Sequence, residues 1–205
     1  MHLGSGASIC CVQNGKSLDT SMGLTPLAGL PGATRSGDVD PTTILHYIRT
    51  SHASVDTAEE VLNKKSGWKA LTGTTSFGDI AKRSDDETKL AFDLFVDRIL
   101  NFVGAYYLKL GGQVDALVFA GGIGEKSAEL RDTVASKCQC LGFKFDPAKN
   151  QRLEGEGPVR ALCDVRSRSA DGKHAKNVLV CETDEQLEMS LQCMQDGELY
   201  ENGDL

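Results

Sequence analysis

Apolar residues near the middle of the chain recur every three or four positions, which is the spacing of one helix face. The pattern runs from Asp85 to Leu110 and predicts a single long amphipathic helix. Gly111-Gly112 follows and predicts a left-handed end to that helix. The side chains expected to face the core are Leu90, Phe92, Phe95, Ile99 and Phe102.

Short apolar runs elsewhere predict strands. The runs "SICCVQ" and "KSLDTSM" are joined by Asn14-Gly15, a strong signal for a tight hairpin. Three more runs are predicted to be strands: "DALVFA", "GFKFD" and "NVLVCE". Between the hairpin and the first helix, residues 23–40 carry two prolines and four glycines, which predicts an ordered loop.

Polar capping residues mark the starts of the remaining helices. Asp40 before Pro41 predicts a helix start, and a second helix is expected over about 54–64. Ser127 is expected to cap a helix that reaches about Cys140, and a closing helix is expected over about 184–194. "GWKALTGTTSFGDI" is expected to form turns and short elements, and "GGIGEK" is expected to form a turn. The order of elements predicts an α/β fold with at least one antiparallel strand pair.

Composition limits the classes of protein that this chain can belong to. The 205 residues are 40% hydrophobic and 25% charged, which suits one large globular domain. A net charge of −7 argues against general affinity for nucleic acid. No run has the length and apolarity of a membrane span, and the absence of a targeting signal predicts the cytoplasm. The seven cysteines include no Cys-x-x-Cys pair and are expected to be buried free thiols.

Two glycine turns are the main candidates for ligand chemistry. In "HLGSGAS" and "VFAGGIGEKS", the absence of Cβ atoms allows backbone amides to approach an anion or a ribose. The second turn lies between a predicted strand and a helix start, a favoured place for a nucleotide. Glu125 and Ser127 stand where the phosphate-loop and dinucleotide motifs require glycine. The alternative is that both turns serve only folding.

Arg35 is the main candidate for charge neutralisation. It lies between two glycines in "GATRSGDVDP", where a guanidinium could clamp a phosphoryl group in transfer. The alternative is that Arg35 pairs with Asp38 or Asp40 and fixes the loop. Glu185 belongs to an acidic cluster at a helix start, where carboxylates are common because they favour the dipole; a magnesium role is also open.

Together, "HLGSGAS", "NGKSLDTSMGLTPLAGLPGATRSGDVDP", "LVFAGGIGEKSAELR" and "ETDEQLE" resemble the acetate kinase family in order and spacing. The wording of the long loop is most similar to eukaryotic, fungal-type members. The resemblance covers nearly the whole chain but only the C-terminal half of a typical member. It implies the ribonuclease H-like fold of actin, sugar kinases and Hsp70, with a mixed sheet and flanking helices. It also implies reversible transfer of the ATP γ-phosphoryl to acetate with Mg²⁺, which gives acetyl phosphate and ADP.

The resemblance also implies roles for individual residues. Arg35 would stabilise the phosphoryl group in transfer, Pro26 would line the pocket for the acetate methyl group, and Glu185 would be linked to magnesium. The residues expected to bind the nucleotide are His2, Leu3, Gly4, Ser5, Gly6, Ser76, Phe77, Gly78, Gly122, Ile123, Gly124, Glu125 and Lys126. Homodimers would form through this half of the protein.

Departures from the family pattern leave some properties open. Ser5 and Lys126 stand where many members have Asn, and residues 76–78 replace an Asp-x-Arg element, so the phosphate donor is open between ATP and another compound. Residues 1–195 are expected to form the C-terminal nucleotide-binding domain, followed by an acidic tail over 196–205. The first strand of this domain and the whole N-terminal domain are expected to be missing.

Three alternatives follow for function. The chain is expected to have negligible turnover by itself, as an inactive portion of an acetate kinase. It could instead be a catalytically dead nucleotide-binding or dimerisation module. A propionate or butyrate kinase differs from an acetate kinase only in pocket width, worth about 1–3 kcal/mol per methylene, so Pro26 alone does not decide between them.

Overall fold

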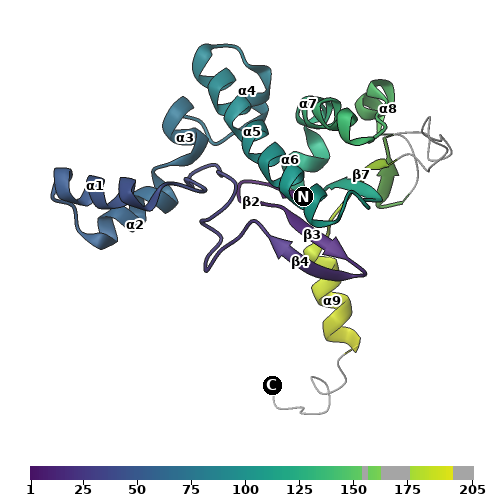
Figure 1. Cartoon of the computed structure of the whole chain (residues 1–205), viewed down its shortest axis with the longest axis horizontal. Coiled ribbons are helices and arrows are strands. Elements are labelled where there is room, and N and C mark those ends of the chain that lie inside the picture. The colour runs from purple at the N-terminus through teal and green to yellow at the C-terminus, as the bar shows by residue number, and fades with distance from the viewer. Residues whose placement is uncertain (154–156, 163–175, 196–205) are drawn as a thin grey trace.

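The computed structural model describes residues 1–153, 157–162 and 176–195 of the chain shown in Figure 1. The strands are β1 His2–Leu3, β2 Ala7–Ser8, β3 Cys10–Gln13, β4 Lys16–Thr20, β5 Ala116–Phe119, β6 Val159–Ala161 and β7 Asn177–Cys181. The helices are α1 Pro41–Ser51, α2 Val55–Lys64, α3 Gly67–Thr72, α4 Phe77–Lys82, α5 Asp86–Lys109, α6 Gly121–Lys126, α7 Ala128–Cys138, α8 Pro147–Arg152 and α9 Glu185–Gln195. A 3₁₀ turn, η1 Gln139–Leu141, follows α7.

The strands form three small sheets. β1 pairs with β2, and β3 pairs with β4 in the hairpin that Asn14-Gly15 predicts. In the third sheet the order is β5-β7-β6, with β5 and β7 parallel and β6 antiparallel. The mixed strand directions confirm the α/β prediction. His2 also forms a parallel bridge to Ala120, so the first residues of the chain run alongside the end of β5.

Helix α5 carries the largest part of the core. Phe92, Phe95 and Ile99 are fully buried, as their spacing predicts, whereas Leu90 is 57% exposed and Phe102 is half-buried. Leu90 was therefore wrongly placed in the core, because the apolar stripe predicted for this helix is wider than the face it buries. Trp68 of α3 and Phe77 of α4 pack edge-on against Phe95, with ring centroids 5.5 and 5.3 Å away. Each fully buried ring contributes about 1.5–3 kcal/mol, so α3 and α4 are held firmly on α5.

The caps predicted at Asp40 and Ser127 are confirmed, and the helices expected from about 54 and 85 are capped as well. The side chains of Asp40, Ser54 and Ser127 each accept a hydrogen bond from a backbone N–H in the first turn of α1, α2 and α7. Asp85 and Thr88 form a reciprocal capping box at the start of α5. Gly111 and Gly112, after the end of that helix, both have positive φ. These caps satisfy donors and acceptors that the helix backbone leaves unpaired.

Two predicted elements differ in the structure. "GGIGEK" is the helix α6 and not a turn, since Arg131 donates to the carbonyls of Gly124 and Glu125 and satisfies the end of that helix. "GFKFD" is not a strand. Phe143 makes one isolated bridge, and Asp146 then caps α8, which the sequence reading does not predict.

The thiols are only partly as expected. Among the described residues all cysteines are free, which agrees with the prediction. Cys11 and Cys138 are buried, but Cys10, Cys140 and Cys193 are exposed. Cys163 and the predicted tail over 196–205 lie outside the described residues.

Candidate functional site

The first glycine turn is an exposed hairpin tip. It joins β1 to β2, and the N–H of Gly4 donates to the carbonyl of Gly6 at 3.1 Å. Leu3, immediately before the turn, is fully buried, while Ser5 and Gly6 are exposed. The buried leucine therefore anchors a turn whose tip is open to a ligand.

The second glycine turn lies against the first. The N–H of Leu3 donates to the carbonyl of Ala120 at 2.8 Å, immediately before α6. Gly121 has φ of +75°, and a Cβ at this position would lie 2.9 Å from the carbonyl oxygen of Leu3 and 3.1 Å from Nε2 of His2. Only glycine allows both this backbone conformation and this close approach. Residues 2–6 and α6 consequently form one continuous wall.

The loop that carries Arg35 extends the same wall. The N–H of Ala33 donates to the carbonyl of Ser5 at 2.9 Å. A Cβ on Gly6 would lie 3.0 Å from Nη1 of Arg35, so the guanidinium lies over the first glycine turn. Arg35 also lines a cavity of about 470 Å³ together with Glu59 and Glu60 of α2.

The two aspartates near Arg35 have other partners. Asp38 accepts a hydrogen bond from the N–H of Gly29 at 2.7 Å, and Asp40 caps α1. No ion pair of Arg35 with either carboxylate occurs in the described part of the chain. The loop is therefore fixed by the aspartates, and Arg35 is left to face the turn.

A larger cavity lies between α4 and α6. Its volume is about 730 Å³, and it brings together Phe77 and Gly78 with Gly122, Ile123 and Lys126, five of the residues predicted to bind the nucleotide. Ser76 occupies the N-cap position of α4, next to this cavity wall. Segments about 45 positions apart in the sequence thus meet at one cavity, because α4 and α7 both pack on α5.

Cations gather at this cavity although the whole chain is acidic. Lys82 and Arg83 line it with Lys126, against one carboxylate, Glu129. Lys82 also pairs with Asp79, and the Arg83 guanidinium lies 4.6 Å from the centroid of the Phe92 ring. The sequence reading did not select Lys82 or Arg83, and the only available signal was their adjacency in "FGDIAKR". A cavity with this charge suits an anionic ligand.

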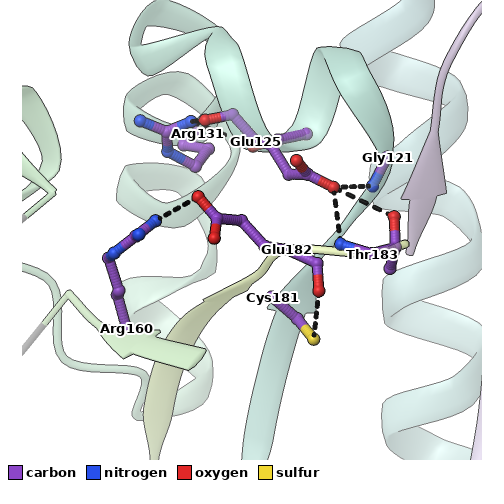
Figure 2. A network of polar contacts seen from close by, with 8 residues as sticks. Gly121, Glu125, Arg131, Arg160, Cys181, Glu182 and Thr183 are labelled. Carbon is purple, nitrogen blue, oxygen red and sulfur yellow. Dashed lines mark hydrogen bonds and ion pairs between the residues drawn. The ribbon is translucent and has the colours of Figure 1, made fainter. Parts of the chain in front are cut away.

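Glu125 connects α6 to the segment after β7, as Figure 2 shows. Its Oε1 accepts from the N–H of Gly121 at 3.1 Å and from both the N–H and the hydroxyl of Thr183, at 3.1 and 3.0 Å. The carboxylate of Glu125 thus points toward Thr183, and its predicted contact with a nucleotide stays a prediction.

Arg131 supports α6 from the other side. Its guanidinium is buried, donates to both carbonyls at the end of α6, and donates through Nε to Oδ1 of Asn150 at 2.7 Å. Burial lowers the pKa of Arg131. In Figure 2, Arg131 reaches from α7 to the end of α6, while the carboxylate of Glu125 points toward Gly121 and Thr183. The sequence reading missed this role, because a lone arginine in a helix gives no signal of what it will contact.

The last two predicted residues lie at the edges of the wall. Glu185, at the start of α9, is exposed, and its Oε1 lies 4.0 Å from Nε2 of His2. Pro26 is exposed on the loop before Arg35 and lines none of the cavities described above. In the described ranges no group of three or more His, Cys, Asp or Glu side chains could hold a metal by itself.

Solved kinase structures share this fold. Acetate kinase from Porphyromonas gingivalis is 33% identical with a TM-score of 0.82, over 95% of this chain and 47% of that one. A propionate kinase from Francisella tularensis is 38% identical with a TM-score of 0.79, over 91% and 46%. The fold is therefore that of the actin and sugar kinase class, which is ribonuclease H-like.

The sequence comparison then gives the family. The pattern of the acetokinase family matches residues 1–190. A probable acetate kinase from Emericella nidulans is 54% identical, over 94% of this chain and 48% of that protein. The chain belongs to the acetokinase family, which confirms the resemblance.

Two further facts bear on the protein as a whole. The chain spans about half the length of the curated relatives it matches. Within the described residues, none of the helices combines the length and the apolar composition needed to cross a lipid bilayer.

Proposed function

We propose that this chain carries the nucleotide-binding side of an acetate kinase, which transfers the γ-phosphoryl of ATP reversibly to acetate. The observation that supports this most strongly is the single wall formed by residues 2–6, Arg35 and α6, next to the cation-lined cavity. Phosphoryl transfer requires positioning and charge neutralisation more than covalent chemistry by the protein. Glycine turns and separated cations supply both.

Each part of the wall has a role in this proposal. The cavity between α4 and α6 holds the nucleoside, with Phe77 and Ile123 as apolar contacts and Lys126 beside the phosphates. The turn Gly4–Gly6 faces the terminal phosphates. Arg35 lies over this turn and neutralises charge that spreads over the phosphoryl oxygens. Glu125 and Arg131 keep α6 in place and thereby fix the cavity wall.

Magnesium fits the residues at this edge of the site. Mg²⁺ in nucleotide sites is held by one or two carboxylates together with phosphates and water. Glu185 offers one exposed carboxylate beside His2, next to the proposed phosphate position. A bound Mg²⁺ would neutralise phosphate charge there. The phosphate donor stays open between ATP and another compound.

The acceptor and the partners are proposed from the family. Acetate is the proposed acceptor, and propionate is the alternative, since a propionate kinase is among the similar structures. Pro26 is proposed to contact the methyl group of acetate in the complete site. We also propose a cytoplasmic homodimer through this domain, with no nucleic-acid or membrane partner.

Calorimetric titration of the chain with ADP in the presence of Mg²⁺ tests the proposal. Binding should be saturable, and Lys126→Met should weaken it by about tenfold, the loss of one charge-assisted contact. Lys137→Met is the matched control, because Lys137 is exposed and does not line the cavity. Equal affinities for both variants and the parent would contradict the proposal. In a hydroxamate assay with acetate, ATP and Mg²⁺, the chain alone should give no product above background.

A further inference from the structure

A single carboxylate oxygen joins the start of α6 to the segment between β7 and α9. Oε1 of Glu125 accepts hydrogen bonds from the N–H of Gly121 at 3.1 Å and from the N–H and the hydroxyl of Thr183 at 3.1 and 3.0 Å. Figure 2 shows these contacts converging on one side-chain oxygen. Because hydrogen bonds to an ionised group are about twice as strong as neutral ones, this carboxylate fixes Thr183 relative to Gly121.

The residue before Thr183 is held on the side of β6. The N–H of Glu182 donates to the carbonyl of Pro158 at 2.7 Å, and Nη1 of Arg160 donates to Oε1 of Glu182 at 2.8 Å. In Figure 2, Glu182 extends toward Arg160 and away from Glu125. The segment is therefore anchored at two successive residues, Glu182 beside β6 and Thr183 on α6.

This anchored segment determines where α9 begins. The side chain of Asp184 accepts from the N–H of Leu187 at 2.9 Å, as a helix N-cap residue does, and its carbonyl accepts from the N–H of Glu188 at 3.1 Å. Asp184 directly follows Thr183, and Glu185 is the first residue of the helix. One residue therefore separates the contact made by Glu125 from the backbone that carries the carboxylate of Glu185.

The contacts close into a ring around the start of α6. Oε1 of Glu185 lies 4.0 Å from Nε2 of His2, and a Cβ on Gly121 would lie 3.1 Å from the same nitrogen. Gly121 donates to Glu125, which holds Thr183 near Glu185. The side chain of Glu185 is 77% exposed, so packing against it is slight. Its position depends mainly on the backbone that Thr183 anchors.

The alternative is that Glu125 only stabilises α6. A residue with that role alone would bond groups of its own helix, as the contact with Gly121 does. The other two contacts go to Thr183, which is 58 positions further along the chain. Arg131 already satisfies the carbonyls at the end of α6. The contacts of Glu125 therefore couple the position of α6 to that of Glu185.

We propose that Glu125 is a positioning residue that couples the nucleotide cavity to the carboxylate of Glu185. The inference rests on the proposed function, in which α6 lines the nucleotide cavity and Glu185 offers an oxygen ligand to Mg²⁺. Glu125 holds α6 and Thr183 in one arrangement, so a nucleotide that orders α6 also orders the start of α9. A nucleotide and a divalent cation then bind more tightly together than separately, because coupling between two sites is reciprocal.

Calorimetric titration of the chain with ADP, once with Mg²⁺ and once with EDTA, measures this coupling as a ratio of two dissociation constants. For the parent, Mg²⁺ should raise the affinity for ADP at least about fivefold, the lower end of typical couplings. Glu185→Gln gives the ratio that remains without this carboxylate. Glu125→Ala should lower the ratio to the same value. Adding Glu125→Ala to Glu185→Gln should lower it no further, because both changes act through one carboxylate.

Thr183→Val tests the same contact without altering α6. It removes one hydroxyl at an exposed position and should lower the ratio at least about twofold, the loss of one hydrogen bond. Thr183→Ser keeps the hydroxyl and should restore the ratio of the parent. Asp132→Ala is the matched control for the loss of a carboxylate, because Asp132 of α7 does not line the cavity between α4 and α6. Its ratio should equal that of the parent.

The possible results separate this inference from the proposed function. An equal ratio in the parent, Glu125→Ala and Thr183→Val would overturn the inference, even if both variants bind ADP more weakly, since Glu125 would then only stabilise α6. Additive losses in the double variant would overturn it as well, and so would a parent whose affinity for ADP does not depend on Mg²⁺. If the parent binds no ADP under either condition, the proposed function fails and this inference fails with it.

Discussion

The backbone N–H of Leu3 donates to the carbonyl oxygen of Ala120 at 2.8 Å, although 117 positions separate the two residues in the sequence. This bond places the turn Gly4–Gly6 directly beside α6. It also places Gly121 against the backbone of Leu3, where a side chain has no room. The contact between the two glycine turns is the structural basis of the candidate site.

The first prediction concerns this contact. Gly121→Ala should lower the free energy of unfolding by about 1–3 kcal/mol, because alanine resists positive φ and its Cβ would meet Leu3 and His2. Urea denaturation measures the change. Gly122→Ala is the matched control, since a Cβ there has no neighbour within 4 Å and φ is not positive. Its free energy of unfolding should stay within about 0.5 kcal/mol of the parent. Similar losses for both variants would show that the close approach of the turns is unimportant.

The second prediction concerns the buried guanidinium of Arg131. Arg131→Lys keeps the charge but loses the fork that bonds the end of α6 and Asn150. The free energy of unfolding should fall by about 3 kcal/mol, since each hydrogen bond to a charged group contributes about 1.5–3 kcal/mol to stability. The same change at the exposed Arg49 of α1 should have an effect within about 0.5 kcal/mol. An unfolding free energy of Arg131→Lys equal to that of the parent would contradict the role given to the guanidinium.

The third prediction concerns pH and the buried thiol of Cys138. Burial raises the pKa of Cys138 to about 11, whereas an unfolded cysteine has a pKa of about 8.5. Its folded pKa is raised, so its contribution to stability is complete below about 8.5 and is lost as pH rises toward 11. Unfolding free energy should therefore fall between pH 8.5 and pH 11 more for the parent than for Cys138→Ala. Cys193→Ala, at an exposed position on α9 that does not contribute to the pKa of Cys138, should follow the parent. Parallel curves for the parent and Cys138→Ala would contradict this assignment.

Local signals in the sequence predicted much of the fold. The capping role of Asp40 before Pro41 depends on neighbouring residues only, so the pattern was sufficient. Asp146 before Pro147 carries the same signal, and α8 could have been found by it. The helix α6 could not be predicted from neighbouring residues, because it depends on Arg131, which contacts it from the next helix.

The site shows the same division between local and distant causes. The glycine turns and Arg35 could be selected from their sequence context. The cations Lys82 and Arg83 could not, because only the packing of α4 and α7 on α5 brings them to the cavity with Lys126. The bond from Thr183 to Glu125 likewise joins residues 58 positions apart. Contacts of this kind follow from tertiary packing and leave no trace in a local pattern.

The most direct test of the central claim is a titration of the ¹⁵N-labelled chain with ADP and Mg²⁺, followed by NMR. If both glycine turns and the cavity form one nucleotide site, the amide signals of Gly4, Gly6, Gly122 and Gly78 should shift together with a single dissociation constant. The signal of Gly15, at the tip of the β3-β4 hairpin, should stay unchanged. Shifts confined to one turn, or none at any of these glycines, would contradict the account.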